Sequence, residues 1–211
     1  MTLTLQRILP SRRSKNQFWL IFSNHLKLPI SSDDYFRFGL KKNQPVSKPL
    51  FEDLKAASLC FLLYNYSLRQ IALAPKIDKI LLPKLKQKLY FYQKKYSLGG
   101  DFSFLLDQIL DKLKTFNLLA EDDFVEYLIR KYHHKPQNYL RQKLALYSLK
   151  LPPDFQSDEN RLLRTLLTRK KYQNLNWSDP KVKNKIFASL YRKGFAYNDI
   201  KTAIDELSKK S

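Results

Sequence analysis

The stretch that decides the fold reads Asp179-Pro-Lys-Val-Lys-Asn-Lys-Ile-Phe-Ala-Ser-Leu-Tyr-Arg-Lys-Gly194-Phe-Ala-Tyr-Asn-Asp-Ile200. Within it, Ile186 and Leu190 stand four positions apart and therefore share one face of a helix. Gly194 follows four residues later, where a helix that ends in the left-handed conformation favours glycine. Phe195 then packs back as the chain enters the next helix. The stretch predicts a helix, a sharp turn and a second helix.

Two weaker copies of this spacing lie upstream. The pattern is an apolar residue, a leucine four positions on, and a turn four positions after that. It recurs at Leu85, Leu89 and Gln93, and again at Leu140, Leu144 and Ser148. The letters around the leucines also agree, Lys86-Gln-Lys-Leu89 and Arg141-Gln-Lys-Leu144. Repetition of this kind is typical of stacked helical units, each too small to bury its hydrophobic face alone.

Composition also favours a helical protein with a packed core. The chain has 211 residues, of which 44% are hydrophobic and only 4 are glycine. So few glycines disfavour an all-β fold, which needs many turns with positive φ. Cys60 lies in an apolar run and is interpreted as a small core residue, since a single cysteine forms neither an internal disulfide nor a multi-cysteine zinc site. The N-terminus has no signal-peptide pattern and no apolar run is long enough to span a bilayer, so we expect a cytoplasmic protein without membrane contact.

Residues 1–48 are expected to form a β-rich extension. Alternating, aromatic and β-branched residues separated by short polar turns predict a three-stranded meander over residues 3–8, 18–22 and 25–30. Ser32 or Asp33 is expected to cap a short helix that stops at Gly39. Pro45 and Pro49 are interpreted as marking a linker.

From residue 49 the apolar pattern takes the helical period, and three units are expected at 49–117, 118–156 and 157–211. The predicted fold is mostly α, with three tandem three-helix repeats forming an elongated helical array behind the small N-terminal β-extension. In the first unit we expect one helix ending near Tyr66, a second over Lys79–Tyr96 and a third over Phe102–Asn117. In the second, Pro152-Pro153 leave room only for a short third helix.

Charge gives a second clue. The chain holds 39 Lys and Arg against 19 Asp and Glu, a formal net charge of +20. The middle helix of each unit carries this excess without an acidic residue, which predicts a basic stripe along the stacked units, fit to follow a phosphate backbone. Three merely solvated lysine faces are the alternative. The residues of the stripe are Lys84, Lys86, Lys88, Arg130, Lys131, Lys135, Arg141, Lys143, Lys181, Lys183, Lys185, Arg192 and Lys193.

Three stretches carry a resemblance to a known family. They are Asn117-Leu-Leu-Ala-Glu-Asp-Asp-Phe124, Tyr139-Leu-Arg-Gln-Lys-Leu144, and Lys185-Ile-Phe-Ala-Ser-Leu-Tyr-Arg-Lys-Gly-Phe-Ala-Tyr-Asn-Asp-Ile-Lys-Thr-Ala-Ile204. They resemble, in order, the junction between the first two repeats, a central helix and the C-terminal motif of the RecX family, bacterial regulators of the RecA recombinase. Phe38-Gly-Leu-Lys-Lys-Asn43 is similar to the end of the strand-rich extension of its long members.

The sequence departs from the family pattern at its turns. Ser148 and Gln93 stand where glycine is usual in the second and first repeats, and Leu81-Leu-Pro-Lys-Leu85 lacks the serine and glutamate of the family's first repeat. The resemblance is closest from Leu118 onward.

The resemblance implies a regulator that is not an enzyme. RecX-like proteins bind in the groove of the RecA–DNA filament, inhibit its ATPase, coprotease and strand-exchange activities, and bind DNA themselves. This implies a monomer whose partners are the RecA filament and single- or double-stranded DNA, in recombination, repair and the SOS response. Two alternatives stay open: a general helical-repeat DNA- or RNA-binding protein without a recombinase partner, and a transcription factor with a helix-turn-helix around Gly194.

The sequence shows no pattern of an active site. It has no glycine-rich phosphate loop, His-Glu-x-x-His or Cys-x-x-Cys motif, and we expect no cofactor, metal ion or catalytic residue. His133 and His134 are interpreted as a solvated basic loop, and Asp122 with Asp123 as residues at a helix start. Trp177 is expected to be exposed and available to stack on bases.

Overall fold

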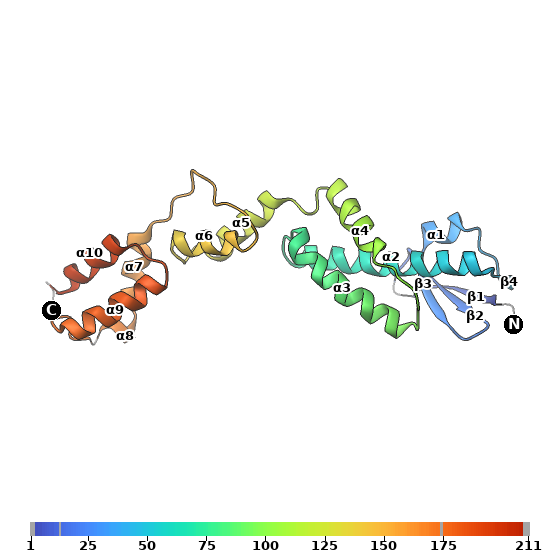
Figure 1. The fold of residues 1–211 in the computed structure, drawn as a ribbon, viewed down its shortest axis with the longest axis horizontal. Coiled ribbons are helices and arrows are strands. Elements are labelled where there is room, and N and C mark those ends of the chain that lie inside the picture. Colours follow the sequence, from blue (N-terminus) through green and yellow to red (C-terminus); the bar gives the residue numbers. More distant parts are fainter. Residues whose placement is uncertain (1–2, 13, 174, 209–211) are drawn as a thin grey trace. The chain divides into compact units, whose positions relative to one another are not determined.

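The structure is a computed structural model that describes residues 3–12, 14–173 and 175–208 (Figure 1). The chain divides into two compact units, one ending at Ala120 and the other beginning at Glu121. The stacking of the repeats into one array stays a prediction.

The first unit begins with a small antiparallel sheet. Its strands follow the order β3-β2-β1-β4 and are β1 (Thr4–Pro10), β2 (Gln17–Phe22), β3 (Lys27–Ser31) and β4 (Gln44–Pro45). The three predicted strands are present. The interpretation of Pro45 and Pro49 as a linker is wrong. Pro45 pairs with Thr4 in the two-residue edge strand, a position where the missing N–H of proline costs no ladder hydrogen bond. Pro49 lies in the first turn of the helix that begins at Lys48, where proline is tolerated.

A short helix, α1 (Ser32–Arg37), follows the sheet as expected. Its cap is Ser31, whose hydroxyl accepts a hydrogen bond from the Asp34 backbone N–H at 3.0 Å, rather than Ser32 or Asp33. Gly39 has a φ of 55° and ends the helix as predicted.

Three helices complete the first unit: α2 (Lys48–Leu73), α3 (Asp78–Lys95) and α4 (Phe104–Thr115). The expected end of the first helix near Tyr66 is wrong. No glycine or proline interrupts the chain until Pro75, and the added turns lie in the same core, where Ser67 is buried and its hydroxyl donates to the Leu63 carbonyl oxygen at 2.9 Å. The helix stops only where the residue before Pro75 becomes extended.

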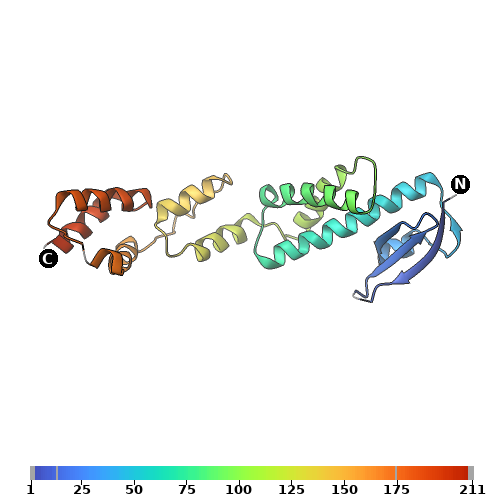
Figure 2. The same ribbon diagram turned by 90° about the horizontal axis from the view of Figure 1, so that it is seen from below.

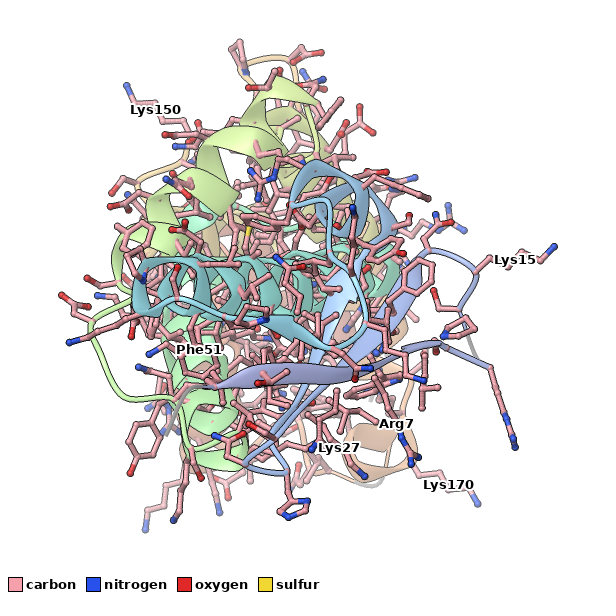
Figure 3. The ribbon with its side chains drawn as sticks, turned by 90° about the vertical axis from the view of Figure 1, so that its right-hand side faces the viewer. Arg7, Lys15, Lys27, Phe51, Lys150 and Lys170 are labelled. Carbon is pink, nitrogen blue, oxygen red and sulfur yellow. The ribbon has the colours of Figure 1, made fainter. Side chains whose placement is uncertain are left out.

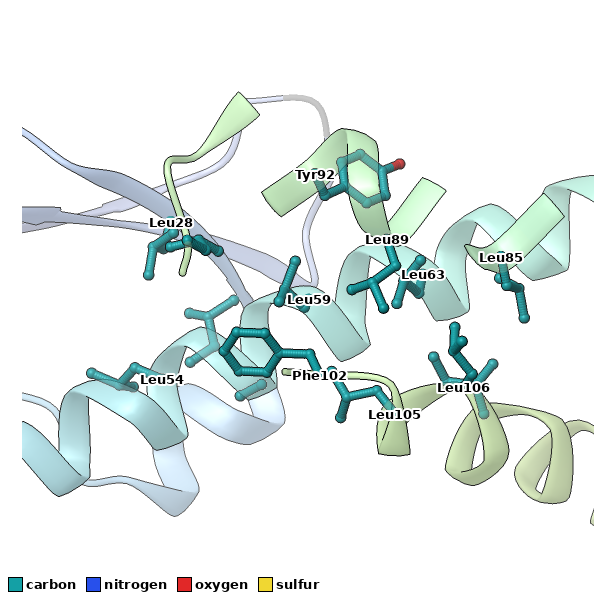
Figure 4. Packing of buried hydrophobic residues seen from close by; sticks show 14 of the residues in the cluster. Leu28, Leu54, Leu59, Leu63, Leu85, Leu89, Tyr92, Phe102, Leu105 and Leu106 are labelled. Atoms are coloured by element: carbon teal, nitrogen blue, oxygen red, sulfur yellow. The ribbon is translucent and has the colours of Figure 1, made fainter. Parts of the chain in front are cut away.

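Leucines of all three helices form the core of this unit (Figure 4). Leu59 and Leu63 of α2 face Leu85 and Leu89 of α3, the two leucines of the first predicted repeat. Leu105 and Leu106 of α4 pack into the same core, because α4 contacts both α2 and α3. The spacing of four between buried leucines is therefore a packing pattern in this repeat, as predicted.

The turn of the first repeat is one helical turn later than predicted. Gln93 lies inside α3, and the residue with positive φ is Ser97, at 52°. Leu98 N–H then donates to the Gln93 carbonyl oxygen at 2.9 Å. The prediction of a turn at Gln93 is wrong because the helix continues to Lys95, which lets Tyr96 and Leu98 pack into the core after it.

The second unit contains the remaining helices (Figure 2). They are α5 (Glu121–Lys131), α6 (Gln137–Ala145), α7 (Glu159–Leu167), α8 (Lys170–Gln173), α9 (Pro180–Arg192) and α10 (Tyr197–Ser208). The expectation of three helices in each repeat holds for residues 49–117 but is wrong for 118–156, where the described residues form only α5 and α6. Pro152 and Pro153 lie in the segment that would have held the third helix.

The two predicted turns of this unit are confirmed. Ser148 has a φ of 62° and Gly194 a φ of 97°. After each turn the next backbone N–H reaches back to the predicted leucine: Leu149 N–H donates to the Leu144 carbonyl oxygen at 3.0 Å, and Phe195 N–H to that of Leu190 at 3.4 Å. Both helices thus end in the same left-handed capping motif.

A compact cluster of buried side chains holds the third repeat together. Its members are Leu163, Leu167, Tyr172, Trp177, Leu190, Phe195, Ile200 and Ile204, with Ile186 half-buried against them. Trp177 is only 4% exposed. The expectation of an exposed Trp177 is therefore wrong, since its polar neighbours in sequence do not keep the large indole ring out of the core.

The second and third repeats meet at the first turn of α6, within the second unit. The Glu159 carboxylate accepts a hydrogen bond from the Gln137 backbone N–H at 2.9 Å, and the Gln137 side-chain amide donates to the Phe155 carbonyl oxygen at 3.0 Å. A carboxylate at this position also complements the positive end of the helix dipole. Gly194 lies beside the same turn, where a Cβ atom would stand 3.3 Å from the Tyr139 backbone nitrogen.

One ion pair links α3 to α4 in the first unit and gives a pH-dependent prediction. The Asp78 carboxylate lies 3.0 Å from the Lys114 ammonium, and this hydrogen bond, with the Lys79 backbone N–H, lowers the pKa of Asp78. The two side chains are 40% and 53% exposed, so solvent screens the pair, and Asp78→Asn is expected to lower the free energy of unfolding by only about 0.5 kcal/mol at pH 7.

Because the pKa of Asp78 is lowered on folding, its contribution is complete above the pKa of the unfolded chain and is lost as the pH falls through the folded value. The measurement is urea unfolding of wild type and Asp78→Asn at a series of pH values. Their stabilities should converge in acid. A difference that persists unchanged below the folded pKa would contradict the ion pair as its cause.

Candidate nucleic-acid interface

Lysine and tyrosine side chains alternate along α5, the following loop and α6. The Lys131 ammonium lies 5.4 Å from the ring centroids of both Tyr127 and Tyr132. Tyr127 and Lys131 stand four positions apart on α5, which brings their side chains together. The Tyr127 phenol raises the pKa of Lys131 and so favours its charged form. An exposed cation is thus held between two aromatic rings.

Tyr139 holds two further lysines in the same way. The Lys135 and Lys143 ammonium groups lie 5.7 and 5.6 Å from its ring centroid. The Tyr132 ring meets the Tyr139 ring edge to face, with centroids 5.4 Å apart. We call this connected set the Lys–Tyr cluster; its members are Tyr127, Lys131, Tyr132, Lys135, Tyr139 and Lys143.

The chemistry of the Lys–Tyr cluster suits a phosphate backbone. A ring beneath an ammonium group restrains the flexible lysine side chain without neutralising its charge, and such contacts are worth about 0.5–1 kcal/mol each at exposed sites. The cation keeps its donors for an anion. Aromatic side chains among cations are also the combination with which proteins bind single-stranded nucleic acid, because bases stack on the rings while phosphates meet the cations.

The two arginines predicted beside these lysines have different surroundings. Arg130 is exposed and lies 3.9 Å from the Glu126 carboxylate on the same helix. Arg141 lines a cavity of about 810 Å³ together with carboxylates of the third repeat, among them Asp158 and Glu159. The predicted stripe therefore divides at α6, because residues 141 and 143 lie on different sides of a helix.

The predicted cations of α3 lie in the first unit. Lys86 is exposed, Lys84 donates to the side-chain oxygen of Gln70 at 3.0 Å, and Lys88 lies 4.7 Å from the ring centroid of Phe91. Alignment of these side chains with those of the second unit stays a prediction.

The predicted cations of α9 form two groups. Lys181, Lys183 and Lys185 occupy its first turns, whereas Arg192 and Lys193 stand at its C-terminal end, more than about 10 Å further along the helix axis. The structure brings Arg192 and Lys193 together with Lys135 of the second repeat, because all three line one cavity of about 330 Å³.

Sequence reasoning missed several residues of this surface. Tyr127, Tyr132 and Tyr139 were not singled out, although the spacing of four between Lys135, Tyr139 and Lys143 was a visible signal. Arg169 and His134 were missed as well, and both line the 330 Å³ cavity. Arg169 and His134 line the same cavity only because the third repeat packs against the loop before α6. No local sequence pattern predicts that packing.

In the described part of the chain, no three side chains of His, Cys, Asp or Glu gather as metal ligands would. Over the same residues, no helix combines the length and the hydropathy that crossing a bilayer requires.

Short helical units behind a small sheet, with lysines held on tyrosine rings, define a basic helical-repeat protein. Residues 157–204 match the family model described as the third three-helix domain of RecX. Regulatory protein RecX of Lactococcus lactis subsp. lactis (strain IL1403) is 26% identical over 141 residues, which cover 66% of this chain and 50% of that relative. The chain is therefore similar to proteins of the RecX family, most specifically over residues 157–204. It spans about half the length of the curated relative it matches.

The fold agrees with this similarity. A crystal structure of regulatory protein RecX is similar with a TM-score of 0.58 and 16% sequence identity, over 99% of this chain and 100% of that one. The likeness covers the small sheet as well as the helices, so the β-extension is part of the shared fold.

Proposed function

We propose that this protein binds a RecA-type recombinase filament on DNA as a monomer and lowers the filament's ATPase, coprotease and strand-exchange activities. The observation that carries the proposal is the Lys–Tyr cluster, in which three lysines of a RecX-like chain are held 5.4 to 5.7 Å from tyrosine rings. A recombinase filament offers both of the partners that such a surface suits, the phosphates of its DNA and acidic protein side chains.

The proposed role requires binding alone. A protein that occupies a filament can slow its turnover by favouring one conformational state, provided that it binds that state more tightly than the others. No proton transfer or nucleophile of this chain takes part.

The experiment is a titration of RecA-driven ATP hydrolysis on single-stranded DNA. We expect the rate to fall when this protein is added at substoichiometric amounts. Charge reversal of the cluster lysines, Lys131→Glu, Lys135→Glu and Lys143→Glu together, should shift the inhibition curve to higher concentration. Full ATPase activity at saturating amounts of the wild-type protein would refute the proposal.

A general nucleic-acid-binding protein is the second candidate, and the net charge of +20 favours it. Such a protein would bind bare strands with steep salt dependence and would not respond to the recombinase. Recruitment can be compared on bare single-stranded DNA and on preformed filaments at one salt concentration. Preference for the filament supports the first proposal, and equal affinity supports the second.

A further inference from the structure

A cavity of about 330 Å³ in the second unit is walled by cations from two repeats. His134 and Lys135 contribute from the loop before α6, Arg169 from the segment after α7, and Arg192 with Lys193 from the end of α9. No carboxylate stands among the described residues that line it. Among the described residues, none of these five side chains forms an ion pair with an acidic residue. Such a concentration of positive charge attracts an anion, although Arg192 also lines the neighbouring cavity that holds Asp158, Glu159 and Asp199.

The cavity also has an apolar wall. It consists of Pro136, Tyr139, Leu162, Leu166 and Phe195. A site of roughly 300 Å³ or more with an apolar wall and a few convergent polar groups is of the size that holds a small organic ligand. A nucleoside phosphate joins a flat apolar base to an anion, so it can contact the apolar wall and the cations at the same time. Inorganic phosphate would contact only the cations.

Two of the cations are already held in place. The Arg192 Nε–H donates to the Ala188 carbonyl oxygen at 3.2 Å, and the Lys193 ammonium to the Tyr172 hydroxyl oxygen at 3.3 Å. Each bond uses one donor and leaves the others, because a guanidinium has five N–H groups and an ammonium three. Holding a side chain before the ligand arrives lowers the entropy cost of binding.

The cavity is continuous with the Lys–Tyr cluster, since Lys135 and Tyr139 belong to both. A strand whose phosphates lie along the cluster therefore reaches the cavity with an adjacent nucleotide. A base inside a duplex would first have to leave its stack, at a cost of a few kcal/mol, which favours a single strand.

We propose that this cavity accepts one nucleotide of single-stranded nucleic acid, with its phosphate near Arg169, Arg192 and Lys193 and its base against Tyr139. The inference rests on the proposed function, because it assigns a task to one end of the same nucleic-acid-binding surface.

The first test is the affinity of the full chain for a short single-stranded oligonucleotide, measured by fluorescence anisotropy. Arg169→Glu is expected to weaken binding about tenfold, because it removes a charged donor and adds a repelling charge. Lys150→Glu changes the net charge equally at an exposed side chain that does not line the cavity and points into solvent (Figure 3). It should weaken binding less than about twofold. Equal losses in the two variants would overturn the proposal.

The second test removes the base instead of changing the protein. An abasic strand of the same length carries the same phosphates but has no base to contact Tyr139. It should therefore bind several-fold more weakly than the complete strand. Arg169→Glu should weaken the binding of both strands, because both keep the phosphate. Equal affinity of the two strands would exclude a base from the cavity. A free mononucleotide, added as a competitor, should displace the strand better than inorganic phosphate does. A mononucleotide that binds as tightly as the oligonucleotide would assign the cavity to a soluble ligand and overturn the assignment to a strand.

The pH dependence of binding provides a further readout. Loss of solvent around the imidazole lowers the pKa of His134, and the neighbouring charges of Lys135, His133 and Arg169 lower it further. Arg192 and Lys193 face it from the end of α9. Because its pKa is lowered, the imidazole gains its charge only at a lower pH than a free histidine does, so the affinity for the strand should rise as the pH falls through that pKa. His134→Gln should remove this rise, and a rise that persists in His134→Gln would place its origin elsewhere.

Failure of this inference and failure of the proposed function are distinguishable. If Arg169→Glu and Lys150→Glu bind the strand equally while the wild type still inhibits RecA-driven ATP hydrolysis, only the cavity is wrong. If the strand experiments give the expected differences but the ATPase does not respond, the recombinase partner is wrong and the cavity stands.

Discussion

Replacing Gly194 by valine is expected to lower the free energy of unfolding of the second unit by about 3 kcal/mol. Two costs combine at this position. The backbone has a φ of 97°, which a β-branched residue resists. A Cβ atom would also stand 3.3 Å from the Tyr139 backbone nitrogen, so the end of α9 would have to move away from α6.

The other glycines separate these two costs. Gly99 has neither positive φ nor a neighbour within 4 Å of a Cβ, and Gly39 has a φ of 55° with the same open space. Alanine at Gly99 should therefore change stability by less than about 0.5 kcal/mol, and alanine at Gly39 should cost about 1 kcal/mol. Gly194→Ala should cost more than Gly39→Ala, since it adds the close approach to α6. Equal costs at the two positions would show that the approach to Tyr139 contributes nothing.

The two tryptophans make the measurement specific to each unit. Trp177 is buried in the core of the third repeat, and Trp19 lies on β2 of the first unit. In a Trp19→Phe background, urea unfolding followed by fluorescence reports the second unit alone. Gly194→Val should shift that transition to lower urea concentration. An unchanged transition midpoint would contradict the role of the left-handed turn.

Charge reversal of the three lysines of the Lys–Tyr cluster is expected to have the largest effect on binding. Lys131→Glu, Lys135→Glu and Lys143→Glu together should weaken the affinity for single-stranded DNA by at least about 100-fold at low salt. The slope of log affinity against log salt should become shallower by about two to three, because up to three phosphate contacts are lost. The measurement is a salt series of anisotropy titrations.

The control variant reverses three exposed lysines of the first unit, Lys15, Lys41 and Lys42. Its net charge changes by the same amount, and Lys15 points away from the body of that unit (Figure 3). If the affinity depends on a local site, the control should keep most of its affinity and its salt slope. Equal losses in the two variants would mean that net charge alone attracts the strand.

Local sequence was sufficient to predict the features that depend on neighbouring residues. The first three strands of the extension and the turns at Ser148 and Gly194 all follow from alternation, helical spacing and capping preferences. The absence of acidic residues from α6 and α9, and from α3 after its first residue Asp78, is likewise a property of the sequence. These features need no distant contact, because a cap or an amphipathic face is decided within one or two helical turns.

The features that the sequence did not predict depend on the energy of packing distant residues together. The helix α2 continues past Tyr66 and α3 past Gln93 because the added turns pack against the core of the first unit. The helix preferences of the residues themselves are too weak to predict this continuation. Trp177 is buried although its neighbours in sequence are polar, since the free energy of burying an indole ring outweighs their solvation.

The sequence by itself determined that this chain is a basic, mostly helical RecX-like protein with repeated helix ends. Only the tertiary structure decided which cations act together. It separates Arg141 from Lys143 and joins Lys135 to Arg169, Arg192 and Lys193 around one cavity. The physical reason is that charge is a property of each residue, whereas a binding site requires side chains from different helices to converge, and that convergence is set by the packing of the second repeat against the third.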